Sequence, residues 1–137
     1  MALLPQKVQF FTGTVLNNLC AWDENPDRGR LNAILVELDL LNLIDNLPDG
    51  LETLMGIDGW QFTNGQSQMF GLARILYINP EIVLLDEPDV SLDEHYLEIF
   101  NKTLVKLKAA SNTIILVTHR QSLIAQADTV VEIRAKS

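Results

Sequence analysis

The stretch IVLLDEPDVSLDEHY, residues 82–96, decides how this chain folds. Its first four residues are apolar, enough for a strand but too few for a buried helix, and a turn signal, NPE at 79–81, comes directly before it. Four carboxylates follow the end of this strand: Asp86, Glu87, Asp89 and Asp93. In open parallel α/β sheets the loops at this edge bind ligands. One carboxylate there can hold Mg²⁺, usually through water, and a neighbouring one can polarise an attacking water.

A single Asp after a strand has a simpler explanation, because it often only caps the next helix. Four acids and a proline within residues 86–93 are harder to explain in this way. We therefore expect this segment to belong to a functional site.

The composition is that of one globular domain. The chain has 137 residues, of which 47% are hydrophobic and 20% are charged, so it can bury one core. The formal net charge is −8 and the ten Lys and Arg residues are scattered, so we expect no nucleic acid partner. Cys20 is the single cysteine, so it forms no intramolecular disulfide, which fits a reducing cytosol, and no Cys/His cluster provides a zinc spacing.

From the sequence we expect neither a membrane-spanning segment nor a signal segment. No apolar run approaches the ~20 residues that a spanning helix needs, and the N-terminus lacks the charged start of a signal peptide. Any association with a membrane is therefore expected to come from a partner.

Strands and helices alternate along the chain. MALLPQ (1–6) predicts a short strand that Pro5 stops, and the apolar spacing in RLNAILVELDLLNLIDNL (30–47) predicts a helical layer. Thr63 and Gln66 have the spacing of a capping box at the start of a helix over 65–78. The predicted buried side of that helix consists of Met69, Leu72, Ala73 and Leu76, and a third amphipathic helix is marked by Leu97, Phe100, Leu104 and Leu107. NTIILVTH (112–119) predicts a second buried strand and TVVEIR (129–134) a third. The predicted fold class is α/β with a mainly parallel sheet.

Read in order, the polar clusters of this chain resemble the second half of the nucleotide-binding domain of ATP-binding cassette (ABC) transporters. Asp86 and Glu87 look like the Walker B motif, VSLD (90–93) is similar to the D-loop, and His119 in ILVTHR resembles the switch histidine. Gln6 in LLPQKVQFFTGTVLNNL looks like the Q-loop glutamine, and FTNGQSQMFGLARIL (62–76) resembles the signature motif, usually LSGGQ, with its helix. The Q-loop phrase and LPDGLET (47–53) are closest to the exporter branch.

The resemblance implies a partial P-loop NTPase fold and a set of site residues. Asp86 and Gln6 would hold Mg²⁺, Glu87 would orient or deprotonate the hydrolytic water, and His119 would contact the γ-phosphate of ATP. The remaining nucleotide-binding residues would be Thr63, Asn64, Gly65, Gln66 and Asp93. The unpaired N–H groups at the start of the signature helix, with the Thr63 hydroxyl, can bind an anion, which in this family is the γ-phosphate held by the opposite subunit.

The resemblance also implies partners and a location. The partners would be ATP, a second ABC ATPase domain and the transmembrane domains of a transporter, at the cytoplasmic face of a membrane. The chain would divide into a Q-loop strand and loop (1–13), a helical subdomain with the signature motif (14–78) and part of the ATPase core (79–137), as one truncated domain.

Three positions depart from the family pattern. Thr63 keeps a hydroxyl where Ser is usual, and Asn64 replaces a glycine where a phosphate must approach. Ile57 stands where exporters commonly carry Glu, which affects the expected contact with transmembrane domains. None of the seven glycines is followed by Lys, so a G-x-x-x-x-G-K-[ST] loop is expected upstream of Met1, and the isolated chain is predicted to be inactive.

Other interpretations remain open. Taken alone, Gln6 is a surface amide, His119 a loop residue, and Thr63 with Gln66 only a helix cap. The whole chain could be a non-catalytic module that presents its signature motif to a partner ATPase, which Asn64 favours. An ABC-type ATPase of DNA repair is a third possibility, against which the acidic composition argues.

Overall fold

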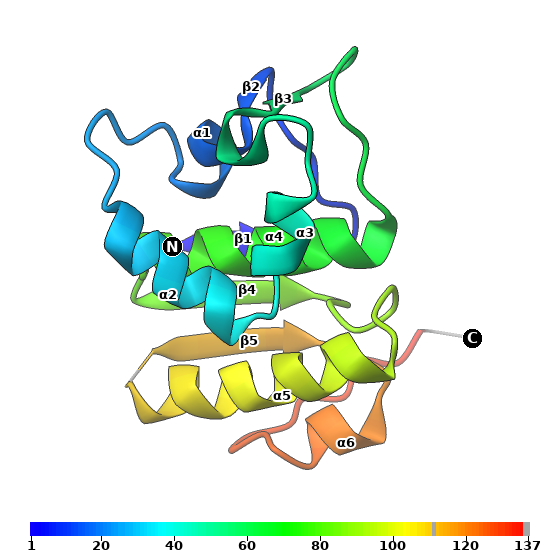
Figure 1. Cartoon of the computed structure of the whole chain (residues 1–137). Coiled ribbons are helices and arrows are strands. Elements are labelled where there is room, and N and C mark those ends of the chain that lie inside the picture. The colour runs from blue at the N-terminus through cyan, green and yellow to red at the C-terminus, as the bar shows by residue number, and fades with distance from the viewer. Residues whose placement is uncertain (111, 136–137) are drawn as a thin grey trace.

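Three parallel strands form the sheet in which the acidic stretch begins (Figure 1). The structure is a computed structural model that describes residues 1–110 and 112–135. β1 (Ala2–Leu4) and β5 (Thr113–Val117) flank β4 (Ile82–Asp86), and Leu85 is in register with Leu4 on one side and Leu116 on the other. The C-terminal ends of all three strands therefore meet at one edge.

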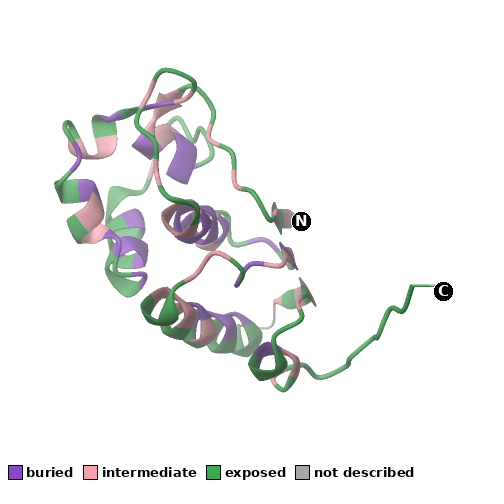
Figure 2. Ribbon diagram, turned by 90° about the vertical axis from the view of Figure 1, so that its right-hand side faces the viewer, coloured by how far each residue is buried: buried purple, intermediate pink, exposed green. Residues whose placement is uncertain are grey.

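Two long helices cover one face of this sheet. α4 (Asn64–Ile78) packs on β1 and α5 (Glu94–Ala109) packs on β5, and both lie on the same side of the strands (Figures 1 and 2). The predicted apolar side of α4 is confirmed for Met69, Leu72 and Ala73, which are buried. Its fourth member, Leu76, is half-buried. In α5, Phe100, Leu104 and Leu107 are buried as the helical spacing indicates, while Leu97 is half-buried.

The opposite face of the sheet is largely bare (Figure 2). Leu3, Ile115 and Val117 expose 58%, 52% and 52% of their surface. The prediction that residues 112–119 form a strand is confirmed, but the prediction that this strand is buried is wrong. A continuous apolar run is typical of a strand covered on both faces, whereas β5 lies at a sheet edge and only its Ile114 and Leu116 side packs against the core.

The helical layer lies above α4 and contains a short two-stranded sheet. Its elements are β2 (Gly13–Thr14), α1 (Val15–Leu19), α2 (Arg28–Glu37), α3 (Leu41–Asp45), the 3₁₀ turn η1 (Gly50–Glu52) and β3 (Leu54–Met55). The predicted apolar stripe is divided between α2 and α3, because Asp39 takes a left-handed backbone conformation (φ 56°) between them. β2 and β3 pair antiparallel, which the sequence did not predict.

The prediction of a third strand near the C-terminus is wrong. Residues 129–134 form no strand, and no backbone hydrogen bond joins them to another described part of the chain. Val131 and Ile133 are 79% and 91% exposed. A strand needs the N–H and C=O groups of a neighbour, and here the chain leaves α6 (Gln121–Ile124) without reaching a sheet edge.

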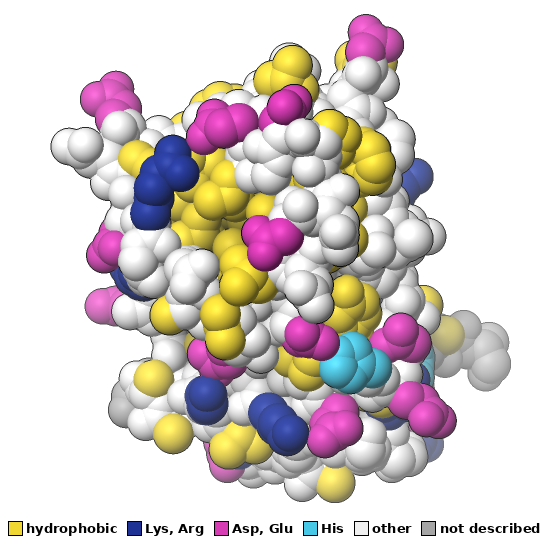
Figure 3. Space-filling model, viewed as in Figure 1, with side chains coloured by type: hydrophobic (Ala, Val, Ile, Leu, Met, Phe, Trp, Pro, Cys, Tyr) yellow, Lys and Arg dark blue, Asp and Glu magenta, His cyan; other side chains and the backbone are white. Residues whose placement is uncertain are grey.

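Two surface features bear on partners. Over residues 1–110 and 112–135, no helix is long and apolar enough to cross a bilayer. On the face that carries α2, α3 and α5, the Lys and Arg side chains stand among acidic and apolar ones and form no continuous basic stripe (Figure 3).

Candidate functional site

Three loops that leave the sheet edge bring Gln6, Glu87 and His119 together. The Gln6 amide Nε2 donates a hydrogen bond of 2.7 Å to Oε2 of Glu87, and Nε2 of His119 lies 3.3 Å from the other carboxylate oxygen, Oε1. Gln6 follows β1, Glu87 follows β4 and His119 follows β5. Gln6 and Glu87 are more than 80 positions apart along the chain. The parallel register explains why these three residues lie close together, because it aligns the C-terminal ends of the three strands at the same edge of the sheet.

The backbone holds Glu87 in an uncommon conformation. Its φ is +44°, in the left-handed region that few non-glycine residues occupy. Its N–H donates to the Val117 carbonyl oxygen at 2.8 Å, which ties the turn after β4 to the end of β5. The turn directs a carboxylate whose side chain is only 25% exposed toward Gln6 and His119. Conformations of this kind are found preferentially at functional sites.

Asp86, at the last position of β4, is half-buried, and its carboxylate has no hydrogen bond or ion pair with the described residues. Those residues contain no group of three His, Cys, Asp or Glu side chains that could hold a metal ion alone. Mg²⁺ is usually bound through one or two carboxylates together with water and substrate phosphates. The unpaired Asp86 carboxylate, directly before Glu87 in the chain, is of the type that binds such an ion, with phosphate completing its shell.

The start of α4 forms a second group of predicted site residues. The capping box is confirmed: the Thr63 hydroxyl accepts from the Gln66 N–H at 3.2 Å, and the Gln66 side chain accepts from the Thr63 N–H at 3.0 Å. Both residues thus act as a cap in this structure. Gly65 lies so close to the Ser91 carbonyl oxygen that a Cβ would stand 2.8 Å from it.

Asp93 faces this helix start from the loop after β4. Its carboxylate caps α5, accepting from the Tyr96 N–H at 2.8 Å. Asp93 and Tyr96 line one small cleft with Thr63, Asn64 and Gly65. The structure therefore separates the predicted residues into two sets, one around Glu87 and one between the starts of α4 and α5.

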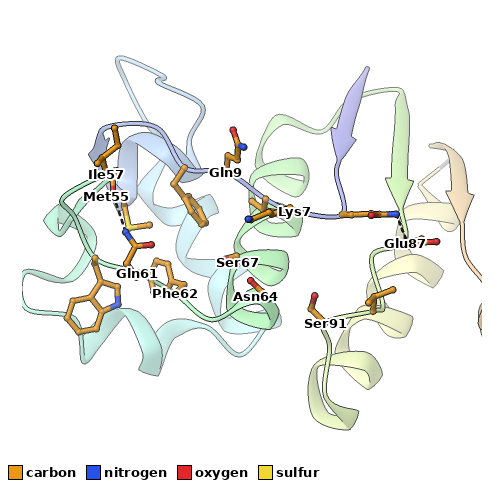
Figure 4. Close-up of a pocket in the computed structure, with 16 residues that line it drawn as sticks. Lys7, Gln9, Met55, Ile57, Gln61, Phe62, Asn64, Ser67, Glu87 and Ser91 are labelled. Carbon is orange, nitrogen blue, oxygen red and sulfur yellow. Dashed lines mark hydrogen bonds between the residues drawn. The ribbon is translucent and has the colours of Figure 1, made fainter.

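A cleft of about 630 Å³ connects the first set with the helical layer. Glu87, Ser91 and Asn64 lie at one end, and Met55, Ile57 and Phe62 lie at the other (Figure 4). The second end is mainly apolar, with Gln61 as a polar member, and Ile57 is 92% exposed there. The cleft thus joins a polar region at the sheet edge to an apolar surface.

Gln68, for which the sequence pattern predicts no functional role, holds the loop that carries Gln6. Gln68 is 3% exposed, and its Nε2 donates to the Pro5 carbonyl at 3.1 Å and the Gln6 carbonyl at 2.7 Å. A polar residue beside Met69 on the predicted apolar side of a helix is the signal that could have revealed it.

The sequence pattern likewise predicts no functional role for Arg74. Its Nε donates to the Asn18 carbonyl at 2.8 Å, and its guanidinium lies over the Phe10 ring, 5.7 Å from the centroid. Burial lowers the pKa of Arg74. The buried Asn18 amide in turn bonds both the N–H and the carbonyl of Phe11, so α4 supports the segment that follows Gln6 at a second point.

Comparisons with known proteins show which sequences and structures the chain resembles. A family profile described as "AAA domain, putative AbiEii toxin, Type IV TA system" matches residues 44–125. The chain is 34% identical over 128 residues to the type I secretion system ATP-binding protein PrsD of Rhizobium meliloti, covering 93% of this chain and 22% of PrsD. It is 33% identical over 135 residues to the ATP-dependent lipid A-core flippase of Burkholderia orbicola, covering 98% of this chain and 22% of the flippase.

A solved structure of an ABC exporter is also similar to this chain. The chain superimposes on a bacterial Atm1-family ABC exporter with ATP bound, with a TM-score of 0.78 and 29% identity over 92% of this chain and 22% of the exporter. The chain thus spans about a fifth of the length of these relatives.

The fold, the sheet-edge site and these matches define the class as an ATPase domain with a P-loop NTPase fold. The chain belongs to the AAA domain family, and the relatives that it matches over nearly all of its length are ATP-binding proteins of the ABC exporter type. Use of ATP and Mg²⁺ is general in this class of ATPases.

Proposed function

We propose that residues 1–137 are the C-terminal part of the ATP-binding and ATP-hydrolysing domain of an ABC transporter that couples hydrolysis to export. The observation that carries this proposal is the Glu87 carboxylate, held between Gln6 and His119 at the carboxyl edge of a parallel sheet. A carboxylate with one oxygen near an amide and the other near an imidazole can orient a water and accept its proton.

Each residue of this set has a separate task. Glu87 orients or deprotonates the attacking water, and His119 donates a hydrogen bond to the γ-phosphate. Asp86 and the Gln6 amide oxygen would hold Mg²⁺, which neutralises phosphate charge when bound. Because Gln6 donates a hydrogen bond to Glu87, a displacement of the loop after β1 changes the position of the carboxylate that receives the proton.

The residues between α4 and α5 would serve a second nucleotide. Thr63, Asn64, Gly65 and Gln66, with Asp93, would meet ATP held by a second ATPase domain in a dimer. Backbone N–H groups at the start of a helix favour a phosphate group at this place.

The apolar end of the large cleft would face the transmembrane domains, on the cytoplasmic side of a membrane. Ile57 and Trp60 are exposed there, so this contact would be apolar at a position where exporters commonly carry Glu. The proposed division of the chain is 1–13, 14–78 and 79–137, with the cleft formed by residues of all three parts.

Glu87→Gln in the complete transporter tests the proposal. We expect ATP turnover to be nearly abolished and ATP binding to be kept, because the substitution removes the proton acceptor and few phosphate contacts. Steady-state phosphate release measures turnover, and Glu52→Gln is the matched control, since Glu52 forms only an exposed ion pair with Arg28. Turnover within threefold of the unmodified transporter would exclude Glu87 as the catalytic base.

A second candidate function is a non-catalytic module that presents its signature motif to a partner ATPase. Asn64 supports it, because its side chain occupies the cleft where a glycine would leave room for phosphate. In that case Glu87→Gln leaves the partner's turnover unchanged, while substitutions at Thr63 or Gly65 lower it.

A further inference from the structure

Asp89 is a buried carboxylate to which the proposed chemistry assigns no task. It lies two positions after Glu87, in the turn that follows β4, and only 6% of its surface is exposed. An ionised carboxylate is costly to bury unless it is paired and hydrogen-bonded. Its partners therefore indicate what this position requires.

Both oxygens of Asp89 bind the loop after β5. Oδ1 accepts from the Thr118 hydroxyl at 3.1 Å, and Oδ2 accepts from Nε of Arg120 at 3.0 Å. The Thr118 hydroxyl oxygen also accepts the Arg120 N–H at 3.0 Å, which closes the cluster. Asp89 thus holds the residues immediately before and after His119.

His119 depends on these neighbours for its position. Its side chain is 91% exposed, and its polar partner among the described residues is the Glu87 carboxylate at 3.3 Å. Since almost no packing restrains the ring, the backbone of residues 118–120 determines where it points.

We infer that Asp89, acting through Thr118 and Arg120, is a positioning residue that keeps His119 against Glu87. The inference rests on the function proposed for those two residues. A purely structural task is a weaker explanation, because the Glu87 N–H already ties the two strands through the Val117 carbonyl at 2.8 Å. The Asp89 cluster adds its restraint just beyond that bond, where His119 leaves the sheet.

Kinetics of the complete transporter test this inference. We expect Asp89→Ala to lower kcat about tenfold, equivalent to ~1.4 kcal/mol, with KM for ATP within twofold, and Arg120→Ala to act in the same direction. Asp89→Ala combined with His119→Ala should be no worse than His119→Ala alone, because Asp89 acts through the histidine. Glu52→Ala, which breaks an exposed ion pair, is the control and should change neither constant.

A structural measurement separates this inference from the proposed function. In nuclear magnetic resonance spectra of the 137-residue chain, recorded at a concentration where light scattering shows a monomer, we expect Asp89→Ala to abolish the contact between the His119 ring and the Glu87 side chain. Amide exchange protection of Leu85 and Leu116, within the strands, should stay unchanged.

Several results would overturn the inference: a kept ring contact, additive losses in the double variant, or collapse of strand protection in Asp89→Ala. If Glu87→Gln leaves turnover unchanged while Asp89→Ala still abolishes the ring contact, the proposed hydrolysis fails and the positioning of His119 by Asp89 stands.

Discussion

Asn64 and Gly65 are neighbours at the start of α4, and they differ in the space available to a side chain. The Asn64 side chain is exposed and lines both clefts, so space is available around it. Gly65 faces the Ser91 carbonyl, where a Cβ would stand at 2.8 Å. A larger residue is therefore accommodated at position 64 and excluded at position 65.

Asn64→Gly in the complete transporter is expected to keep or raise ATP turnover, because it opens room for a phosphate to approach the helix start. The same change should lower the free energy of unfolding by up to about 1 kcal/mol, because glycine has low helix propensity. Phosphate release and urea unfolding measure the two effects. A large loss of turnover would mean that the Asn64 side chain is itself a ligand.

Gly65→Ala should have the opposite effect on activity. Its methyl group forces the start of α4 away from Ser91, at a cost of about 1–3 kcal/mol in the free energy of unfolding, and turnover should fall with it. Gly29→Ala is the matched control, because its Cβ would meet Asp27 at an ordinary 3.6 Å within α2. Urea unfolding of both variants checks the difference; equal stabilities would show that the 65–91 contact adapts freely.

Among the elements, α4 links the helical layer to the site. It packs on β1, α1 and α2, and it supports the segment after β1 through Gln68 and Arg74. A movement of the helical layer therefore reaches Gln6, and through it Glu87, by direct contacts.

Gln68→Leu tests this link while preserving the side-chain volume. It leaves the Pro5 and Gln6 carbonyls without their side-chain donor, and we expect the free energy of unfolding to fall by about 1–3 kcal/mol. The urea denaturation midpoint of the chain measures the loss. Gln9→Leu, at an exposed amide with no hydrogen bond to the described residues, should leave the midpoint unchanged; equal midpoints for both variants would exclude the support by Gln68.

In the molecule as a whole, the sheet has one covered face and one bare face. Leu3, Ile82, Ile115 and Val117 are exposed on the bare side, and contiguous apolar surface of this kind favours association. The row runs across all three strands because their register is parallel.

We expect the 137-residue chain to self-associate through this surface at high concentration. Ile115→Lys should reduce the association, because a charge on an edge strand opposes strand and face contacts. Light scattering over a concentration series measures the mass. Lys substitution at Val36, an exposed apolar residue of α2, is the control, and a clean monomer of the unsubstituted chain would contradict the prediction.

Local patterns in the sequence determined the main strands and helices around the site. The apolar run before Asp86 predicts β4, the T-x-x-Q spacing predicts the start of α4, and the spacing of Phe100 and Leu104 predicts α5. These signals are local because a strand, a cap and a helix face each depend on residues only a few positions apart. The order of the polar clusters likewise pointed to the ATPase class before any residue was placed in space.

The tertiary structure alone decided the contacts between loops and the burial of each face. The bonds of Gln6 and His119 to Glu87, the Asp89 cluster and the support by Gln68 each join segments at least 29 positions apart. No periodicity reports such pairs, because they arise from strand register and from the path of the chain over the sheet. For the same reason the sequence predicts buried strands at 112–119 and 129–134, because their composition is that of core strands. Within residues 1–110 and 112–135 no layer covers the outer face of the first run and no strand pairs with the second, so both have exposed side chains.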